Sequence, residues 1–108
     1  MIAEINPVEL VAWRHDADRE PPIVVDVREP WEFDYCRIEG SRSWPLRTLP
    51  QAVAELPRER DIVLVCHHGA RSLHAALWLK GAGFHRVHNL RGGVAAWADQ
   101  VEPAMKRY

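Results

Sequence analysis

The sequence predicts an α/β fold of three layers, with helices covering both faces of a largely parallel central sheet. Two short segments, residues 23–27 and 62–65, are apolar almost throughout, which is typical of strands buried on both faces. Helical patterns alternate with strand-like segments along the chain, and this order favours a layered α/β domain. The 108 residues are enough for one core, so we expect a single domain over residues 1–108.

The first helix is predicted from its capping residues. Asn6 is a favourable N-cap, Pro7 suits the first helical position, and Glu9 completes a capping box. The helix is expected to run to about His15. The other elements expected in this half are an edge strand at 2–5, a polar loop at 16–22, a buried strand at 23–27, a helix at 30–35 and a short strand at 41–44.

The strongest predicted helix covers residues 70–80. It follows the apolar strand at 62–65 closely, and Gly81 and Gly83 mark its end. The other elements expected in this half are a modest helix at 49–56, a strand at 87–90 and a helix from 94 to about 101.

Composition excludes several classes of partner. The chain is 47% hydrophobic and 27% charged, with a formal net charge of −1, so nothing favours binding to nucleic acid or an acidic membrane. It has no apolar run of membrane-spanning length, and residues 1–6 lack the pattern of a signal peptide. We therefore expect a cytoplasmic protein. Cys36 and Cys66 are too few for a disulfide framework and form no CxxC pair.

Residues 62–72 have the pattern of an active site. A buried strand leads into Cys66, a loop containing Gly69 follows, and a helix then starts. This order aims backbone N–H groups and the positive end of a helix dipole at the sulfur, which favours the thiolate, the form that attacks. Cys66 also ends a strand, where the sites of open parallel sheets lie.

The alternative is that Cys66 is a small packing residue, as cysteines after buried strands often are. A packing cysteine needs neither Gly69 nor the Arg71-Ser72 pair that opens the helix, so these residues favour a nucleophile.

His67 and His68 add hydrogen-bond donors, or positive charge when protonated, around the same point. A metal site with Cys66 is disfavoured, because adjacent histidines in a tight loop are expected to point apart and no fourth ligand is evident.

Four motifs in order resemble the single-domain rhodanese family, and the resemblance covers nearly the whole chain. They lie at residues 26–33 (DVREPWEF), 38–41 (IEGS), 66–72 (CHHGARS) and 89–97 (NLRGGVAAW). The resemblance implies a rhodanese-like fold and a sulfurtransferase. Many family members have Gly-His where this chain has Cys36-Arg37, so this position does not require a positive φ here. Cys36 is expected to be a packing residue, with a resolving thiol as the alternative.

The resemblance implies that Cys66 takes the outer sulfur from a donor such as thiosulfate and becomes a persulfide. Cyanide, a small thiol or a protein cysteine then removes the sulfur. Arg71 is expected to brace the loop, and no metal or organic cofactor is implied. The residues expected to bind the substrate through the loop are His67, His68, Gly69, Ala70 and Ser72.

Two other classes of function stay open. The first is a cysteine-based phosphatase or an enzyme like arsenate reductase. Four residues separate Cys66 from Arg71, which resembles the sulfurtransferases, whereas related phosphatases carry five. The second is a non-catalytic interaction module or persulfide carrier. Near the site, we expect Arg28 and Glu32 to form a structural ion pair, with Asp26 binding a loop amide or Arg28.

Overall fold

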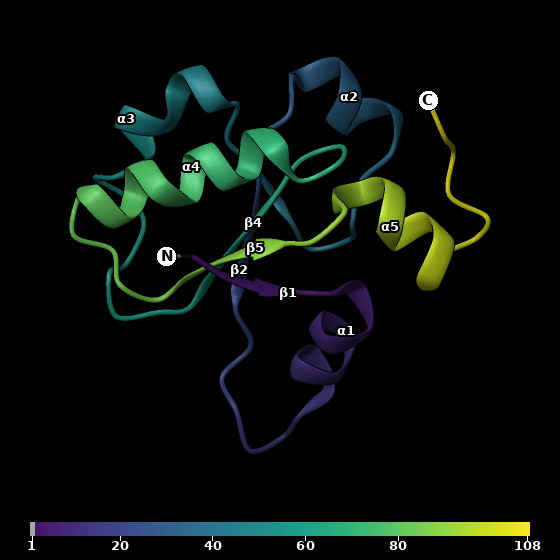
Figure 1. Ribbon diagram of the computed structural model, residues 1–108, viewed down its shortest axis with the longest axis horizontal. Helices are drawn as coiled ribbons and strands as arrows, with labels where there is room; N and C mark the ends of the chain where they lie inside the picture. Colours follow the sequence, from purple (N-terminus) through teal and green to yellow (C-terminus); the bar gives the residue numbers. More distant parts are fainter. Residues whose placement is uncertain (1) are drawn as a thin grey trace.

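The fold is built on a parallel sheet, described by a computed structural model that covers residues 2–108. Within these residues the sheet has five strands in the order β1-β5-β4-β2-β3, every neighbouring pair parallel (Figure 1). The strands are β1 (Ala3–Ile5), β2 (Ile23–Asp26), β3 (Arg42–Ser43), β4 (Ile62–Val65) and β5 (Val87–Leu90). The helices are α1 (Pro7–His15), α2 (Pro30–Tyr35), η1 (Leu46–Thr48, a 3₁₀ turn), α3 (Leu49–Ala52), α4 (Ala70–Gly81) and α5 (Gly93–Gln100).

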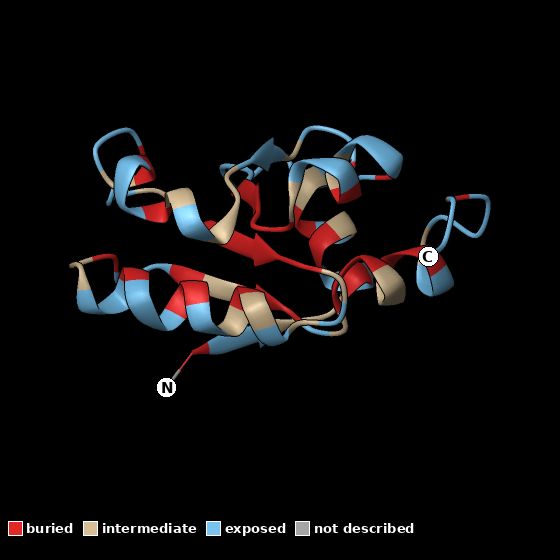
Figure 2. Ribbon diagram, turned by 90° about the horizontal axis from the view of Figure 1, so that it is seen from above, coloured by how far each residue is buried: buried red, intermediate tan, exposed pale blue. Residues whose placement is uncertain are grey.

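Helices cover both faces of the sheet, as predicted. Val25 and Leu64 point to a core shared with α3 and α4, whereas Val24 and Val63 point to a core shared with α1 and α5. Side chains alternate along a strand, so β2 and β4 must be apolar throughout to fill both cores. Figure 2 shows the central strands buried between helices whose outer faces are exposed.

The capping residues of α1 behave as predicted. The Asn6 side-chain oxygen accepts a hydrogen bond from the Glu9 backbone N–H at 2.8 Å. The Asn6 backbone N–H donates to the Glu9 carboxylate, also at 2.8 Å. The helix begins at Pro7 and ends at His15. This start is specified by neighbours three residues apart, so the sequence alone was sufficient to predict it.

The predicted helix at 49–56 is too long. A 3₁₀ turn precedes it, α3 ends at Ala52, residues 53–55 form turns, and the chain bends at Leu56. Leu56 stands before Pro57, and the residue before a proline is disfavoured in the helical region. Leu56 is nevertheless buried with Leu49, so its apolar character reflects packing rather than a continuing helix.

The N-terminus of α5 packs against the end of β4. The amides of Val94 and Ala95 donate to the carbonyls of Cys66 and His67 at 2.9 and 3.0 Å. Gly93 has a φ of +60°, and a Cβ there would lie 2.3 Å from the Cys66 carbonyl oxygen, so this close approach requires glycine. Among the helices of residues 2–108, none is long and apolar enough to span a membrane.

Candidate active site

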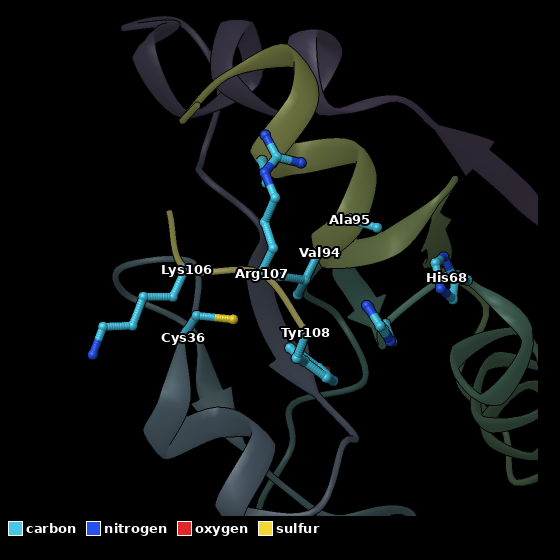
Figure 3. A pocket seen from close by; sticks show the side chains of 9 residues that line it. Cys36, His68, Val94, Ala95, Lys106, Arg107 and Tyr108 are labelled. Atoms are coloured by element: carbon cyan, nitrogen blue, oxygen red, sulfur yellow. The ribbon is translucent and has the colours of Figure 1, made fainter. Parts of the chain in front are cut away.

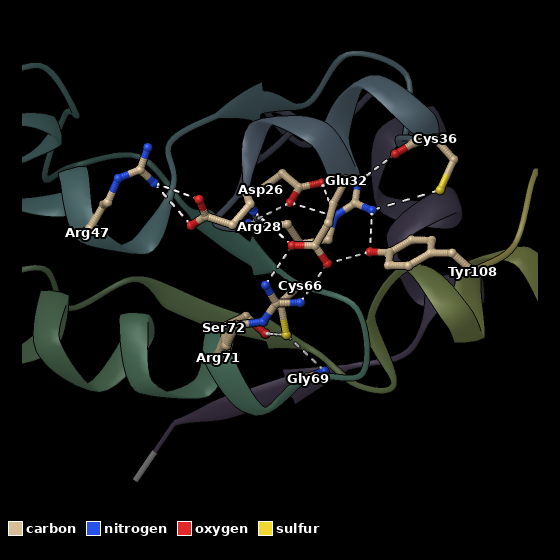
Figure 4. A network of polar contacts seen from close by, with 11 residues as sticks. Asp26, Arg28, Glu32, Cys36, Arg47, Cys66, Gly69, Arg71, Ser72 and Tyr108 are labelled. Atoms are coloured by element: carbon tan, nitrogen blue, oxygen red, sulfur yellow. Dashed lines mark hydrogen bonds and ion pairs between the residues drawn. The ribbon is translucent and has the colours of Figure 1, made fainter.

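Cys66 directly follows β4, with 1% of its surface exposed. Its Sγ accepts a hydrogen bond from the Gly69 amide at 3.0 Å and lies 3.3 Å from the Ser72 hydroxyl (Figure 4). Gly69 has a φ of +108° and is the N-cap of α4, and such a φ strongly favours glycine. Gly69 and Ser72, two of the residues that the sequence predicts to bind the substrate, therefore both lie beside the sulfur. Ala70 is the first residue of α4 and its side chain is exposed.

Arg71 binds Glu32 through both ends of its guanidinium. Nη1 and Nη2 donate to the two carboxylate oxygens at 2.7 and 2.9 Å. The hydrogen bonds from Arg71 outweigh the effect of burial and lower the pKa of Glu32 to about 2, and the same bonds raise the pKa of Arg71. Glu32 is only 4% exposed, so the pair holds the start of α4 against α2.

Arg28 does not pair with Glu32, and that prediction is wrong. Arg28 is fully buried and binds Asp26 instead, with its Nη2 2.7 Å from the carboxylate. Asp26 also accepts a hydrogen bond from the Arg28 backbone amide at 3.0 Å. The sequence analysis expected Asp26 to bind either a loop amide or the Arg28 side chain, and it binds both. Asp26, two positions before Arg28 in the chain, supplies the carboxylate that Arg28 binds. The Glu32 side chain, on α2, binds Arg71 instead.

His67 and His68 stack on each other, with ring centroids 4.0 Å apart and planes at 27°. The prediction that they point apart is therefore wrong. His67 also stacks on Tyr108 at 4.0 Å, so the imidazole is held between two rings. Burial, and then the charge of His68, lower the pKa of His67. His67 is thus less often charged at neutral pH than an unperturbed histidine.

A small cavity of about 150 Å³ opens beside the two histidines (Figure 3). Cys36 and Tyr108 also line it. Cys36 has a φ of −159°, which confirms that no positive φ is needed there. It is 9% exposed and packs in the core beside α1 and α5. Residues 2–108 contain no group of three His, Cys, Asp or Glu side chains able to hold a metal ion.

Tyr108 is a contact of the site that the sequence analysis missed. The chain after α5 returns towards α2 (Figure 1), and the Tyr108 hydroxyl accepts from Arg28 and donates to Glu32, both at 2.8 Å. Burial raises the pKa of Tyr108 to about 12, with the hydrogen bond to Glu32 adding to it. No local pattern marks this residue, because its partners lie 76 and 80 positions away.

Asn89 is the second missed residue. It lies in the motif at 89–97, but sequence reasoning assigned it no role. Its side chain is 1% exposed and within hydrogen-bond distance of both Ser72 and Gly69. Asparagine is depleted in strands, so its presence in the predicted strand at 87–90 was the signal that could have drawn attention to it, because buried polar groups need partners.

Comparison with known proteins adds independent information. Residues 7–100 match the family model described as "Rhodanese-like domain". A sulfurtransferase of Allochromatium vinosum is 42% identical over 87 residues, which cover 81% of each chain. The thiosulfate sulfurtransferase GlpE of Stutzerimonas stutzeri is 35% identical over 75 residues, or 69% of each chain.

Other relatives are longer. The chain spans only 26% and 30% of matching proteins from Mycobacterium tuberculosis and Arabidopsis thaliana. The crystal structure of a rhodanese-like domain protein from Staphylococcus aureus has a TM-score of 0.84 over 99% of both chains, at 24% identity, so the two share a fold. The family model extends over most of the chain and relatives of similar length agree with it. On this evidence the chain belongs to the rhodanese-like domain family.

Proposed function

We propose that this protein is a sulfurtransferase that carries a sulfane sulfur as a persulfide on Cys66. The observation that carries the proposal is the setting of the Cys66 sulfur, at the end of a central strand beside the Gly69 amide and the Ser72 hydroxyl. Such donors stabilise an anionic sulfur. The matching relatives named as sulfurtransferases support the same reaction class.

The proposed reaction has two steps. The Cys66 thiolate attacks the outer sulfur of thiosulfate, the S–S bond breaks, and sulfite leaves with the bonding electron pair. An acceptor such as cyanide or a thiolate then attacks the outer sulfur of the persulfide. The bond between this sulfur and Cys66 Sγ breaks, and its electron pair stays on Sγ as the thiolate. One difficult transfer is thereby divided into two easier ones. The donor is proposed from the relative named a thiosulfate sulfurtransferase.

Arg71 is proposed to brace the loop. Its Nη1 and Nη2 each donate one hydrogen bond to Glu32, which fixes the guanidinium, and with it the start of α4, against α2. The preference for sulfur over phosphate as the group transferred rests on the loop length, because the four residues between Cys66 and Arg71 resemble the sulfurtransferases.

Mass spectrometry of the intact protein tests the proposal directly. Thiosulfate is expected to add about one sulfur, about 32 Da, as a persulfide on Cys66. Cys66→Ser should lose both the adduct and transfer to cyanide, whereas Cys36→Ser, the matched control, should retain them. An adduct that survives Cys66→Ser contradicts the proposal. So does a Cys66-dependent aryl phosphatase activity that exceeds sulfur transfer under matched conditions.

A further inference from the structure

We propose that Asn89 is a positioning residue for the sulfur site and that Glu4 sets its orientation. Both groups beside the Cys66 sulfur are held by the Asn89 side chain. The Ser72 hydroxyl lies 2.5 Å from Asn89 Oδ1, and Asn89 Nδ2 donates to the Gly69 carbonyl at 3.1 Å. This inference rests on the proposed function and assigns a residue to the same site.

The orientation of the Asn89 amide follows from its neighbours. Nδ2 faces two groups that can only accept hydrogen bonds, the Gly69 carbonyl and the Glu4 carboxylate, the latter at 2.9 Å. Turning the amide over would place Oδ1 against both acceptors. Asn89 Oδ1 must therefore face Ser72, and the exposed end of this chain of hydrogen bonds is Glu4.

Ser72 has a single hydroxyl proton and two acceptors within reach. Its Oγ is 2.5 Å from Asn89 Oδ1 and 3.3 Å from Cys66 Sγ. Rotation about the Cβ–Oγ bond moves this proton from the amide to the sulfur while the oxygen stays in place. Asn89 thus provides the resting acceptor and keeps Ser72 positioned for the moment when the sulfur becomes anionic.

Asn89 also acts on the other side of the sulfur. Its bond to the Gly69 carbonyl helps to hold the residue whose amide donates to Cys66 Sγ and whose φ is +108°. A loop held in this way meets the reaction without reorganising, which is the condition for effective stabilisation of a charge.

Steady-state transfer from thiosulfate to cyanide provides the test. In Asn89→Leu and in Glu4→Ala, kcat should fall about tenfold, the equivalent of one hydrogen bond. The KM for thiosulfate should change less than about twofold, because neither side chain contacts the donor. Glu4→Gln retains an acceptor for Nδ2 and should restore most of kcat. Arg91→Ala removes the other Glu4 partner, at 3.3 Å, and is the matched control expected to behave as wild type.

Alkylation of Cys66 by iodoacetamide adds a readout that needs no sulfur donor. The rate should fall in Asn89→Leu and Glu4→Ala and recover in Glu4→Gln. If the wild type transfers no sulfur, the proposed function fails, while alkylation still tests the role of Asn89. Wild-type kcat and alkylation rates in folded Asn89→Leu would overturn the inference. If that variant does not fold, the same result in Glu4→Ala would do so.

Discussion

At the scale of single residues, the site depends on which carboxylate each arginine binds. Glu32 takes both terminal nitrogens of Arg71, and Asp26 takes Arg28. Both carboxylates are almost fully buried, and a buried charge that loses its partner is costly. The two ion pairs therefore affect both the stability of the fold around the site and the charge within it.

Replacing Arg71 tests this coupling. Arg71→Ala should lower the free energy of unfolding by about 2 kcal/mol, because Glu32 loses its counter-charge while Arg71 itself is partly exposed. Adding Glu32→Gln to it should recover part of the loss, measured by urea unfolding. The single variant should lose sulfur transfer by a larger factor than its small unfolded population explains. A loss of transfer that only tracks unfolding would make Arg71 purely structural.

Tyr108→Phe isolates one hydroxyl. It should cost about 1–2 kcal/mol of unfolding free energy, because the buried Arg28 Nη1 loses its 2.8 Å oxygen partner while the ring can still stack on His67. Tyr35→Phe is the matched control, since that hydroxyl makes an exposed contact at 3.4 Å, and it should change stability little. Equal effects in both variants would contradict the role assigned to Tyr108.

At the scale of secondary structure, the site lies where α4 and α5 begin beside the end of β4. The amides of Val94 and Ala95 bind the carbonyls of Cys66 and His67. The start of α5 therefore holds the backbone of Cys66, the proposed nucleophile, from outside the loop that contains it. The glycine at this contact is as important to the geometry as the one inside the loop.

Gly93→Ala tests the contact. A Cβ would lie 2.3 Å from the Cys66 carbonyl oxygen at a φ of +60°, so unfolding free energy should fall by about 2 kcal/mol or more, with loss of sulfur transfer. Gly81→Ala is the control, because nothing lies within 4 Å of a Cβ there and alanine favours helices. Thermal unfolding should show a lower Tm for the first variant alone. An unchanged Tm in Gly93→Ala would refute the close approach.

At the scale of the whole molecule, the low pKa of Glu32 links stability to pH. The folded pKa of about 2 lies below the ordinary 4.5, so the contribution is complete above about pH 4.5 and is lost as pH falls towards 2. We expect the unfolding free energy to fall by about 2–3 kcal/mol as pH falls across this window. In urea titrations across it, Glu32→Gln should show a shallower loss than wild type. Parallel curves for the two proteins would rule out this linkage.

The strand and helix order and the start of α1 could be predicted from the sequence because they depend on neighbours. The capping box joins Asn6 and Glu9, three positions apart. The nearly continuous apolar residues of β2 and β4 predict that both faces of these strands are buried. The loop from Cys66 to Ser72 is equally local. The proposed nucleophile, the glycine and the helix start lie in one short segment of the chain, so the chemistry proposed for this segment could be predicted before its geometry was known.

Only the tertiary structure decided which distant side chains meet around that loop. Glu32 and Arg71 are 39 positions apart, Asn89 and Glu4 are 85 apart, and Tyr108 reaches Arg28 across 80. Glu4 meets Asn89 because β1 and β5 pair with these two residues opposite each other. The other pairs form because parallel strands bring their carboxyl ends to one edge of the sheet and the chain after α5 folds back beside it. A polar side chain buried there binds the partner that packing brings within about 3 Å. Sequence neighbours do not determine which residue that is, so these pairs could not be predicted from the sequence.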